Sequence, residues 1–268
     1  PSGKLAETFP VRLQDTPAYL NFPGEEGEAF YGERIYVGYR WFETREIEPL
    51  FPFGHGLSYT SFDYEDMNVS AERFSDSEGL TVTARITNTG KVAGKEIVQL
   101  YVADPVSSLQ RPVKELKGFT KVSLDPGAST TVRFTLTARD FSFYDSRQSR
   151  WVAESGKFEI GLGASSADIR LSETVHLDST QELNYAFDEY TFLRVLWENE
   201  KTKPLLIELM PAWIASHTAD GKSPEEAEIQ DFLLDQPLVK LPYFTAGEVN
   251  RAQISELIEK CNAMTYRP

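Results

Sequence analysis

A single histidine stands between two glycines in the segment IEPLFPFGHGLSYTSF, residues 47–62, where the residue types could most readily do chemistry. Histidine works as a general base when a carboxylate orients it and a nucleophile lies within reach. The sequence offers His55 no matched partner of either kind. We therefore expect Gly54 and Gly56 to give the backbone freedom to leave one domain and enter the next. The side chains expected to fill the seam between those domains are Phe51, Phe53, Leu57, Tyr59 and Phe62.

The other reactive residue types do not form a site in the sequence. His176 and His217 lack the short spacing of a metal site. The lone Cys261 excludes an internal disulfide and a multi-cysteine metal site. The glycine-rich GLGASS has no following lysine, so we expect a strand end and not a phosphate loop. Clustered carboxylates are expected on solvated loops and helix N-termini. The sequence thus predicts no catalytic residue, no cofactor and no metal ion.

Tryptophan is the residue type here that could bind a sugar, because its ring stacks on apolar faces while its N–H stays hydrated. Trp151 follows the turn-like DSRQSR and is expected to be partly exposed, so it is the candidate sugar-stacking residue. The three others, Trp41, Trp197 and Trp213, lie in strand or helix patterns and are expected in the core.

Composition excludes several classes of protein. Of the 268 residues, 41% are apolar and 25% are charged, which is typical of a soluble globular protein. No apolar run approaches the length of a membrane span, and the formal charge of −14 repels nucleic acid. The single cysteine favours a reducing, cytoplasmic compartment over secretion but leaves the compartment open. The chain starts at Pro1 without an initiator methionine, so we expect a preceding segment.

Three regions differ in their sequence pattern. Residues 1–60 indicate extended chain and turns, with a strand at RIYVGYRWFE in which Ile35, Val37 and Tyr39 alternate with other residues. Residues 61–178 contain six or seven short alternating runs that end at turns such as Asp125-Pro126-Gly127. That pattern predicts an antiparallel β-sandwich, so the chain is expected to be mainly β.

Residues 179–268 indicate three or four short amphipathic helices. STQE at 179–182 and SPEE at 223–226 each place a serine three residues before a glutamate, which predicts a capping box. The helix after Ser223 is expected to run to Asp235, ahead of Pro237. The last helix is expected to begin near Thr245, three residues before Glu248. Its apolar stripe is expected to comprise Ile254, Leu257, Ile258 and Cys261.

Longer motifs carry a resemblance to a known family. YGERIYVGYRWFETREIEPLFPFGHGLSYTSF, TVTARITNTGKVAGKEIVQLYVADP, RPVKELKGFTKVSLDPGASTTVRFTL and GKFEIGLGASS resemble the C-terminal part of the family 3 glycoside hydrolases of the β-glucosidase type. The resemblance covers about residues 2–177. It implies that residues 1–60 are the end of an α/β sandwich domain, residues 61–178 a fibronectin type III-like domain, and residues 179–268 a helical extension.

The resemblance also implies which parts of the enzyme this chain does not include. In that family the aspartate nucleophile and the glutamate acid/base lie upstream of the segment present here, and no Ser-Asp-Trp motif occurs in this sequence. Retaining hydrolysis needs two carboxyl groups roughly 5 Å apart. This chain alone is therefore expected to be inactive, whereas the whole enzyme would hydrolyse terminal β-D-glucosyl residues.

Three hypotheses follow for the function of the chain. In the first, it supports the catalytic domains, with the missing N-terminal catalytic portion as its partner and a homo-oligomer as a further possibility. In the second, it is a free-standing carbohydrate-binding or adhesion module on a fibronectin-like scaffold. In the third, the helical region docks another protein. Because unpaired strand edges recruit other strands, residues 1–60 are expected to self-associate or to fold back on the chain's own surface.

Overall fold

The computed structural model describes residues 1–146, 148–181 and 186–265 of the chain. The chain divides into two compact units, residues 1–183 and 184–268. Each unit has its own hydrophobic cluster, so each is described separately below. The finer boundary expected at residues 60 and 61 remains a prediction.

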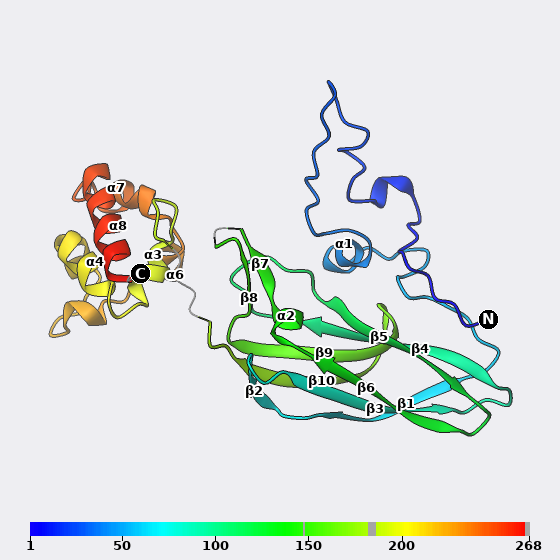
Figure 1. Ribbon diagram of the computed structural model, residues 1–268. Coiled ribbons are helices and arrows are strands. Elements are labelled where there is room, and N and C mark those ends of the chain that lie inside the picture. Colours follow the sequence, from blue (N-terminus) through cyan, green and yellow to red (C-terminus); the bar gives the residue numbers. More distant parts are fainter. Residues whose placement is uncertain (147, 182–185, 266–268) are drawn as a thin grey trace. The chain divides into compact units, whose positions relative to one another are not determined.

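The first unit is built on two β-sheets that lie face to face (Figure 1). The smaller sheet is antiparallel and has the strand order β1 (Phe62–Val69), β3 (Leu80–Asn88) and β6 (Ser129–Leu136). The larger sheet has the order β2 (Arg73–Ser75), β10 (Asp168–Asp178), β9 (Gly156–Ser165), β4 (Gly94–Ala103) and β5 (Glu115–Leu124). Only the short β2 pairs in parallel, with β10; the other pairings are antiparallel. The expected mainly β, antiparallel sandwich is confirmed.

The core of the sandwich follows from alternation along its strands. In β3 every second residue is buried, and Val82 and Ile86 are fully enclosed. Strand β6 buries Val132, Phe134 and Leu136 and exposes the residues between them. Successive side chains on a strand point to opposite faces, so this pattern places one face of each sheet against the other. The helix α2 (Ala138–Phe141), which buries Phe141 in this core, is followed by the hairpin of β7 (Phe143–Asp145) and β8 (Arg150–Val152).

Residues 1–60 differ from the expectation. Their described structure contains the 3₁₀ turn η1 (Leu13–Asp15), the helix α1 (Tyr39–Thr44) and two isolated bridges, but no strand. The strand expected at Ile35–Tyr39 is therefore wrong. Gly38 has φ 55° and directly precedes α1, where Tyr39 and Phe42 are buried at helical spacing. A strand requires a hydrogen-bonded neighbour, and the described residues provide none there.

Helix α1 lies against strand β5 of the same unit. The Leu116 backbone N–H donates a hydrogen bond to Tyr39 Oη at 2.7 Å, and Arg40 forms an ion pair with Glu115 at 3.2 Å. Glu43 and Lys114 form a second ion pair. Residues 39–43 thus fold back on the chain's own sandwich, which is one of the two outcomes expected for residues 1–60. Self-association, the other outcome, remains a prediction.

The second unit is helical. Its helices are α3 (Leu193–Trp197), α4 (Lys203–Leu209), α5 (Pro211–Ser216), α6 (Asp231–Leu234), α7 (Leu241–Phe244) and α8 (Arg251–Thr265). Two 3₁₀ turns, η2 (Pro224–Glu226) and η3 (Leu238–Lys240), lie between them. The expected number of three or four helices is too low, because the described part of the unit breaks into shorter pieces. The expected stripe is confirmed: Ile254, Leu257 and Cys261 are buried, and Ile258 packs against them.

Two expected helix ends were wrong. The Ser223–Glu226 capping box forms, but the chain leaves the helix at Ala227, because the Glu228 N–H donates to the His217 carbonyl instead of continuing the turn. Helix α8 is not capped by Thr245, whose hydroxyl donates to the Leu241 carbonyl. Its cap is formed by Asn250 and Gln253, each accepting a hydrogen bond from the other's backbone N–H at 3.1 and 3.0 Å. STQE includes residue 182, which lies outside the described residues.

Candidate functional site: two clefts of the sandwich unit

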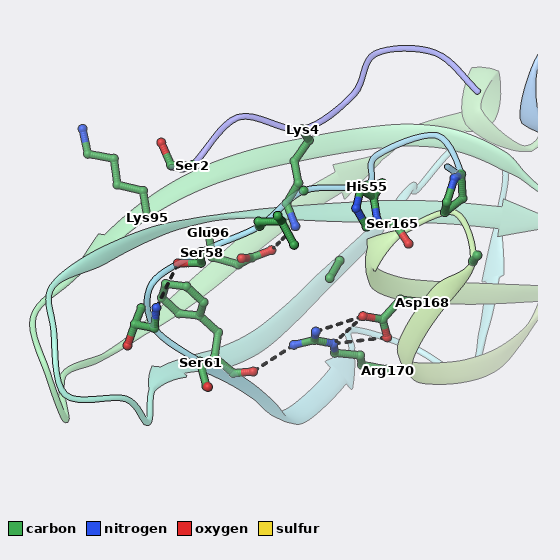
Figure 2. Close-up of a pocket in the computed structure, with 17 residues that line it drawn as sticks. Ser2, Lys4, His55, Ser58, Ser61, Lys95, Glu96, Ser165, Asp168 and Arg170 are labelled. Carbon is green, nitrogen blue, oxygen red and sulfur yellow. Dashed lines mark hydrogen bonds and ion pairs between the residues drawn. The ribbon is translucent and has the colours of Figure 1, made fainter. Parts of the chain in front are cut away.

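The first cleft lies where the N-terminal segment crosses the end of the sandwich and has a volume of about 510 Å³ (Figure 2). Lys4, His55, Glu96, Asp168 and Arg170 line it together with several hydroxyl side chains. Figure 2 shows Lys4 reaching from the N-terminal segment to Glu96 on β4, and Arg170 pointing toward Asp168. The charged groups that line this cleft thus come from segments far apart in the sequence.

Glu96 is the buried centre of this cleft. Its Oε1 lies 3.0 Å from Lys4 Nζ and accepts a hydrogen bond from Tyr64 Oη at 3.1 Å. Only 7% of the Glu96 side chain and 14% of the Lys4 side chain is exposed. Burial, and after it the nearby Glu96 charge, raise the pKa of the Tyr64 phenol. Tyr64 is therefore a hydrogen-bond donor here and not an acid.

Arg170 holds the rim of the first cleft. It donates to the Phe62 carbonyl at 2.8 Å and to Asp168 Oδ2 at 2.9 Å, and its guanidinium lies 4.7 Å from the centre of the Tyr64 ring. Burial alone would lower the pKa of Arg170, but the bond and charge of Asp168 outweigh it and raise the pKa. Arg170 stays charged and ties β10 to the start of β1.

His55 makes the contacts of a packing residue. Its ring lies 5.0 Å from the Phe51 ring, and its backbone carbonyl accepts a hydrogen bond from the Leu5 N–H at 2.8 Å. Across the described residues no carboxylate forms a hydrogen bond or ion pair with the His55 ring. General-base chemistry at His55 thus lacks the orienting group that it requires.

The two glycines beside His55 have different roles. Gly54 has φ +81°, and a Cβ there would collide with the Gln99 side chain. A Cβ on Gly56 would lie 2.6 Å from the Gly3 carbonyl, so Gly56 permits a close approach of two backbone segments. Of the side chains expected in the seam, Phe62 is buried and Phe53 packs on Tyr39, 5.0 Å between ring centres.

Two side chains expected in that seam lie elsewhere. Leu57 is 71% exposed and Tyr59 is 85% exposed. Within this chain they fill no seam, and the expectation that they pack between this unit and a preceding domain remains a prediction. Both follow Gly56 on a loop that runs over the surface toward β1, and a loop of that kind leaves its side chains outward unless another chain covers them.

The second cleft contains Trp151 and has a volume of about 400 Å³. Trp151 is 44% exposed, and its ring lies 5.4 Å from that of Tyr144, edge to face. The guanidinium of Arg139 covers one face of the Trp151 ring. The exposure expected for Trp151 is therefore present, but a face that a sugar would use is occupied by a cation. The role of Trp151 in sugar stacking remains a prediction.

A dense set of charges forms the floor of the second cleft. Arg111 is 5% exposed and donates to Asp104 at 2.9 Å and to Glu115 at 3.0 Å. Glu115 also faces Arg40 at 3.2 Å and Lys117 at 3.4 Å. Burial alone would raise the pKa of Glu115, but attraction by Lys117, Arg111 and Arg40 lowers it. The Glu115 carboxylate thus forms ion pairs with three cations, Arg40, Arg111 and Lys117.

Sequence reasoning missed this charged cluster. Its members lie between residues 40 and 117, on α1, on β5 and on the loop between β4 and β5, and only the folded chain brings them together. A signal did exist in RPVKELKG, where cations alternate with Glu115 along one short segment. Residues two apart on a strand point to the same face, so the spacing places Glu115 and Lys117 together, but such a pattern is also typical of a solvated edge.

The other residues singled out in the sequence lie apart from both clefts or in a core. His176 is 3.5 Å from Asp178, and the His217 ring lies 4.2 Å from the Trp213 ring. Trp197 and Trp213 are buried, as expected. Trp41 is partly buried and donates from Nε1 to the Asp15 carbonyl at 3.0 Å. Among the described residues no cluster of three metal-ligating side chains occurs.

Comparison with protein families identifies one domain. Residues 96–166, which span β4 to β9, match the fibronectin type III-like domain. No helix in the described parts of the chain is long and apolar enough to cross a membrane.

Comparison with known proteins shows more extensive similarity. The chain is 43% identical over 262 residues to thermostable β-glucosidase B of Acetivibrio thermocellus, an alignment that covers 98% of this chain and 35% of that protein. It is 48% identical over 174 residues to β-glucosidase BoGH3A of Bacteroides ovatus, covering 63% of this chain and 23% of that protein. The chain thus spans about a third or less of these relatives' length.

Solved structures agree with the sequence comparison. The GH3 β-glucosidase of Bifidobacterium adolescentis superposes with a TM-score of 0.69 at 37% identity, covering 77% of this chain and 30% of that one. The β-glucosidase 3B of Thermotoga neapolitana gives 0.61 at 44% identity, covering 66% of this chain and 24% of that one. With the sandwich described above, these similarities assign the chain to the C-terminal portion of the family 3 glycoside hydrolases of the β-glucosidase type.

Proposed function

We propose that this chain supports the catalytic domains of a longer β-glucosidase-type hydrolase, which removes terminal β-D-glucosyl residues, and that it contributes no catalytic carboxylate itself. The observation that carries this proposal is the apolar surface of residues 1–60. Leu20 is 90% exposed, Tyr31 82% and Phe22 77%. Large exposed apolar surfaces on soluble proteins mark sites of contact with other polypeptide surfaces.

Unsatisfied polar atoms in the same segment support the proposal. Within the described residues, Thr8 Oγ1, Glu33 Oε2 and Glu43 Oε1 are buried without a hydrogen-bond partner. Leaving such an atom unpaired costs about 1–3 kcal/mol. These oxygens are enclosed by the chain's own atoms, so a catalytic domain that covers residues 1–60 could donate to them only after the segment rearranges. Its surface is expected to be apolar, to match the exposed side chains of this segment.

The compartment and assembly state belong to the same proposal. Cys261 is buried in the helical unit, and burial raises the pKa of its thiol to about 11. A buried, protonated thiol of this kind is compatible with the reducing cytoplasm that we favour for the protein. A homo-oligomer is a further possibility, since the surface that would cover the catalytic domains can also pair with a second copy.

Complementation tests the proposal. The 268-residue chain is mixed or co-expressed with the N-terminal two thirds of the Acetivibrio thermocellus relative, and hydrolysis of p-nitrophenyl β-D-glucoside is measured. We expect a complex with activity that neither part shows alone. The double substitution Phe22→Asp and Tyr31→Asp should abolish complex formation, whereas Phe119→Asp, on the exposed face of β5, should not. Hydrolysis by this chain alone, or equal complementation by both variants, would contradict the proposal.

A free-standing carbohydrate-binding module is the second candidate, and exposure of Trp151 is the observation that favours it. The apolar surface of residues 1–60 argues against it, because an independent module would leave that surface in water. Calorimetric titration with cellobiose distinguishes the two: saturable binding that is lost in Trp151→Ala would support the module.

A further inference from the structure

We infer that the second cleft binds a carboxylate carried on a compact ring, such as a sugar acid. The inference does not require the proposed support function, although two lining residues, Ile35 and Arg40, belong to residues 1–60. It starts from charge: Arg40, Arg111, Lys117 and Arg139 line the cleft, against the carboxylates of Glu115 and Asp140. The chain as a whole has a formal charge of −14, so a cleft with more cations than carboxylates stands out from its surroundings.

Asp140 and Arg139 decide where an incoming anion would sit. Asp140 accepts hydrogen bonds from the Thr137 N–H at 2.7 Å and the Thr137 hydroxyl at 3.0 Å, which commits it to capping α2. Among the described residues, Arg139 forms no ion pair, and its guanidinium lies over the Trp151 ring. A guanidinium whose face lies on an aromatic ring keeps its N–H edge available for a carboxylate.

Lys117 is the second cation that could bind an incoming carboxylate. Its side chain is 15% exposed, and it shares Glu115 with Arg111 and Arg40. Burial lowers the pKa of Lys117, and although the Glu115 charge opposes this, Arg111 lowers it further. A bound anion would offset both the desolvation and the mutual repulsion of these cations, which is the condition under which a partly buried charge contributes to affinity.

The aromatic and apolar residues of the lining indicate that the ligand carries a ring. Trp151 and Tyr144 are 44% and 50% exposed, and Ile35 and Leu109 extend the apolar wall. A volume of about 400 Å³ lies near the lower end of the range for small-molecule sites. A neutral sugar would have to displace Arg139 from Trp151, whereas a ring acid can use that guanidinium. The chemistry therefore favours an acidic ring over a neutral one.

Titration of the full chain tests the inference. Calorimetry and tryptophan fluorescence are recorded with glucuronate, benzoate and glucose, each up to about 10 mM, where weak small-ligand binding is measurable. We expect saturable binding of glucuronate or benzoate, weakening as salt rises, and no binding of glucose. Arg139→Gln should weaken binding at least about 10-fold, because charge-assisted hydrogen bonds are lost. Lys117→Met should also weaken it.

The control is Arg133→Gln, an exposed arginine on β6 away from the cleft, which should bind as the unmodified chain does. Circular dichroism confirms that each variant folds. The inference is overturned if neither acid binds, if glucose binds equally well, or if Arg133→Gln weakens binding as much as Arg139→Gln. It is also overturned if a short glutamate peptide binds in an Arg139-dependent way while neither acid does, since the cleft would then recognise a protein.

Discussion

Lys4 Nζ and Glu96 Oε1 form an ion pair at 3.0 Å, and it joins the N-terminal segment to strand β4 of the sandwich. Both side chains are largely buried, and Glu96 Oε1 also accepts the Tyr64 hydroxyl hydrogen bond. The pair therefore belongs to a network in which each member limits the exposure of the others. Removing one partner leaves a buried charge, which costs more than the pair itself contributes.

Lys4→Met should destabilise the sandwich unit by about 1–3 kcal/mol, because it leaves the buried Glu96 carboxyl without its Lys4 partner. Glu96→Gln should cost less, since the amide oxygen can still accept from Tyr64. Urea unfolding followed by circular dichroism measures both. Lys121→Met, at an exposed position of β5, is the control and should change stability by less than about 0.5 kcal/mol. Equal effects of Lys4→Met and Lys121→Met would show that the pair has no stabilising role.

Gly54→Ala should destabilise the sandwich unit by about 2–3 kcal/mol through two causes. Its φ of +81° disfavours any Cβ, and that Cβ would also displace Gln99 from its hydrogen bond to the Ala164 carbonyl at 2.8 Å. Gly127→Ala separates the causes: its φ is +74°, but nothing lies within 4 Å of its Cβ position. It should cost only about 1 kcal/mol. Similar midpoints for the two variants in thermal unfolding would contradict the role of Gln99.

Glu115 should make stability depend on pH on the acid side. Its folded pKa lies below the ordinary value of 4.5, so its contribution is fully present above about pH 4.5 and is lost as pH falls through the folded pKa. The difference in unfolding free energy between the unmodified chain and Glu115→Gln should therefore shrink from pH 5 toward about pH 3. Urea unfolding at several pH values measures it.

Asp104 provides the opposite case in the same cluster. Burial outweighs Arg111 and raises its pKa above 3.8. The stability that Asp104 contributes should therefore be greatest below about pH 3.8 and should decrease as pH rises through the raised pKa. The difference between the unmodified chain and Asp104→Asn should change with pH in the opposite direction to that for Glu115→Gln. Parallel pH profiles of the two variants would show that these assignments are wrong.

Asn250→Ala should destabilise the helical unit by about 1 kcal/mol, because it removes the side-chain oxygen that caps α8. Ser255→Ala is the matched control: its hydroxyl bonds the Arg251 carbonyl within the helix, and alanine is the better helix former. We expect it to be neutral or slightly stabilising. Helical circular dichroism during thermal unfolding measures both. A larger loss for Ser255→Ala would contradict the assigned cap.

Self-association should rise with concentration, because the apolar side chains of residues 1–60 lie in water. Size-exclusion chromatography with light scattering should show a shift to larger species between about 10 and 500 µM, the range in which weak association is populated. Phe22→Asp with Tyr31→Asp should remove the shift. A monomer at every concentration would reject this prediction.

The sequence determined the sandwich because each strand shows its buried face in its own alternation of apolar and polar residues. Alternation in residues 80–88 and 129–136 fixes which face is buried, and Asp125-Pro126-Gly127 turns the chain locally, with Gly127 at φ +74°. The Ser223 capping box and the apolar stripe of α8 are likewise short-range signals. The family motifs added the expected domain order, which remains a prediction; the fibronectin type III-like match at residues 96–166 lies within its second segment.

The tertiary structure decided the features that depend on contacts between segments far apart in the sequence. Alternation at Ile35–Tyr39 predicted a strand, yet no strand lies beside it among the described residues, and the same side chains start a helix that packs on β5. Arg139 and Trp151 are 12 residues apart in the sequence, and pairing of β7 with β8 accompanies the placement of the guanidinium on the ring. Local patterns specify burial and turns, whereas contacts between distant segments depend on how the whole chain packs.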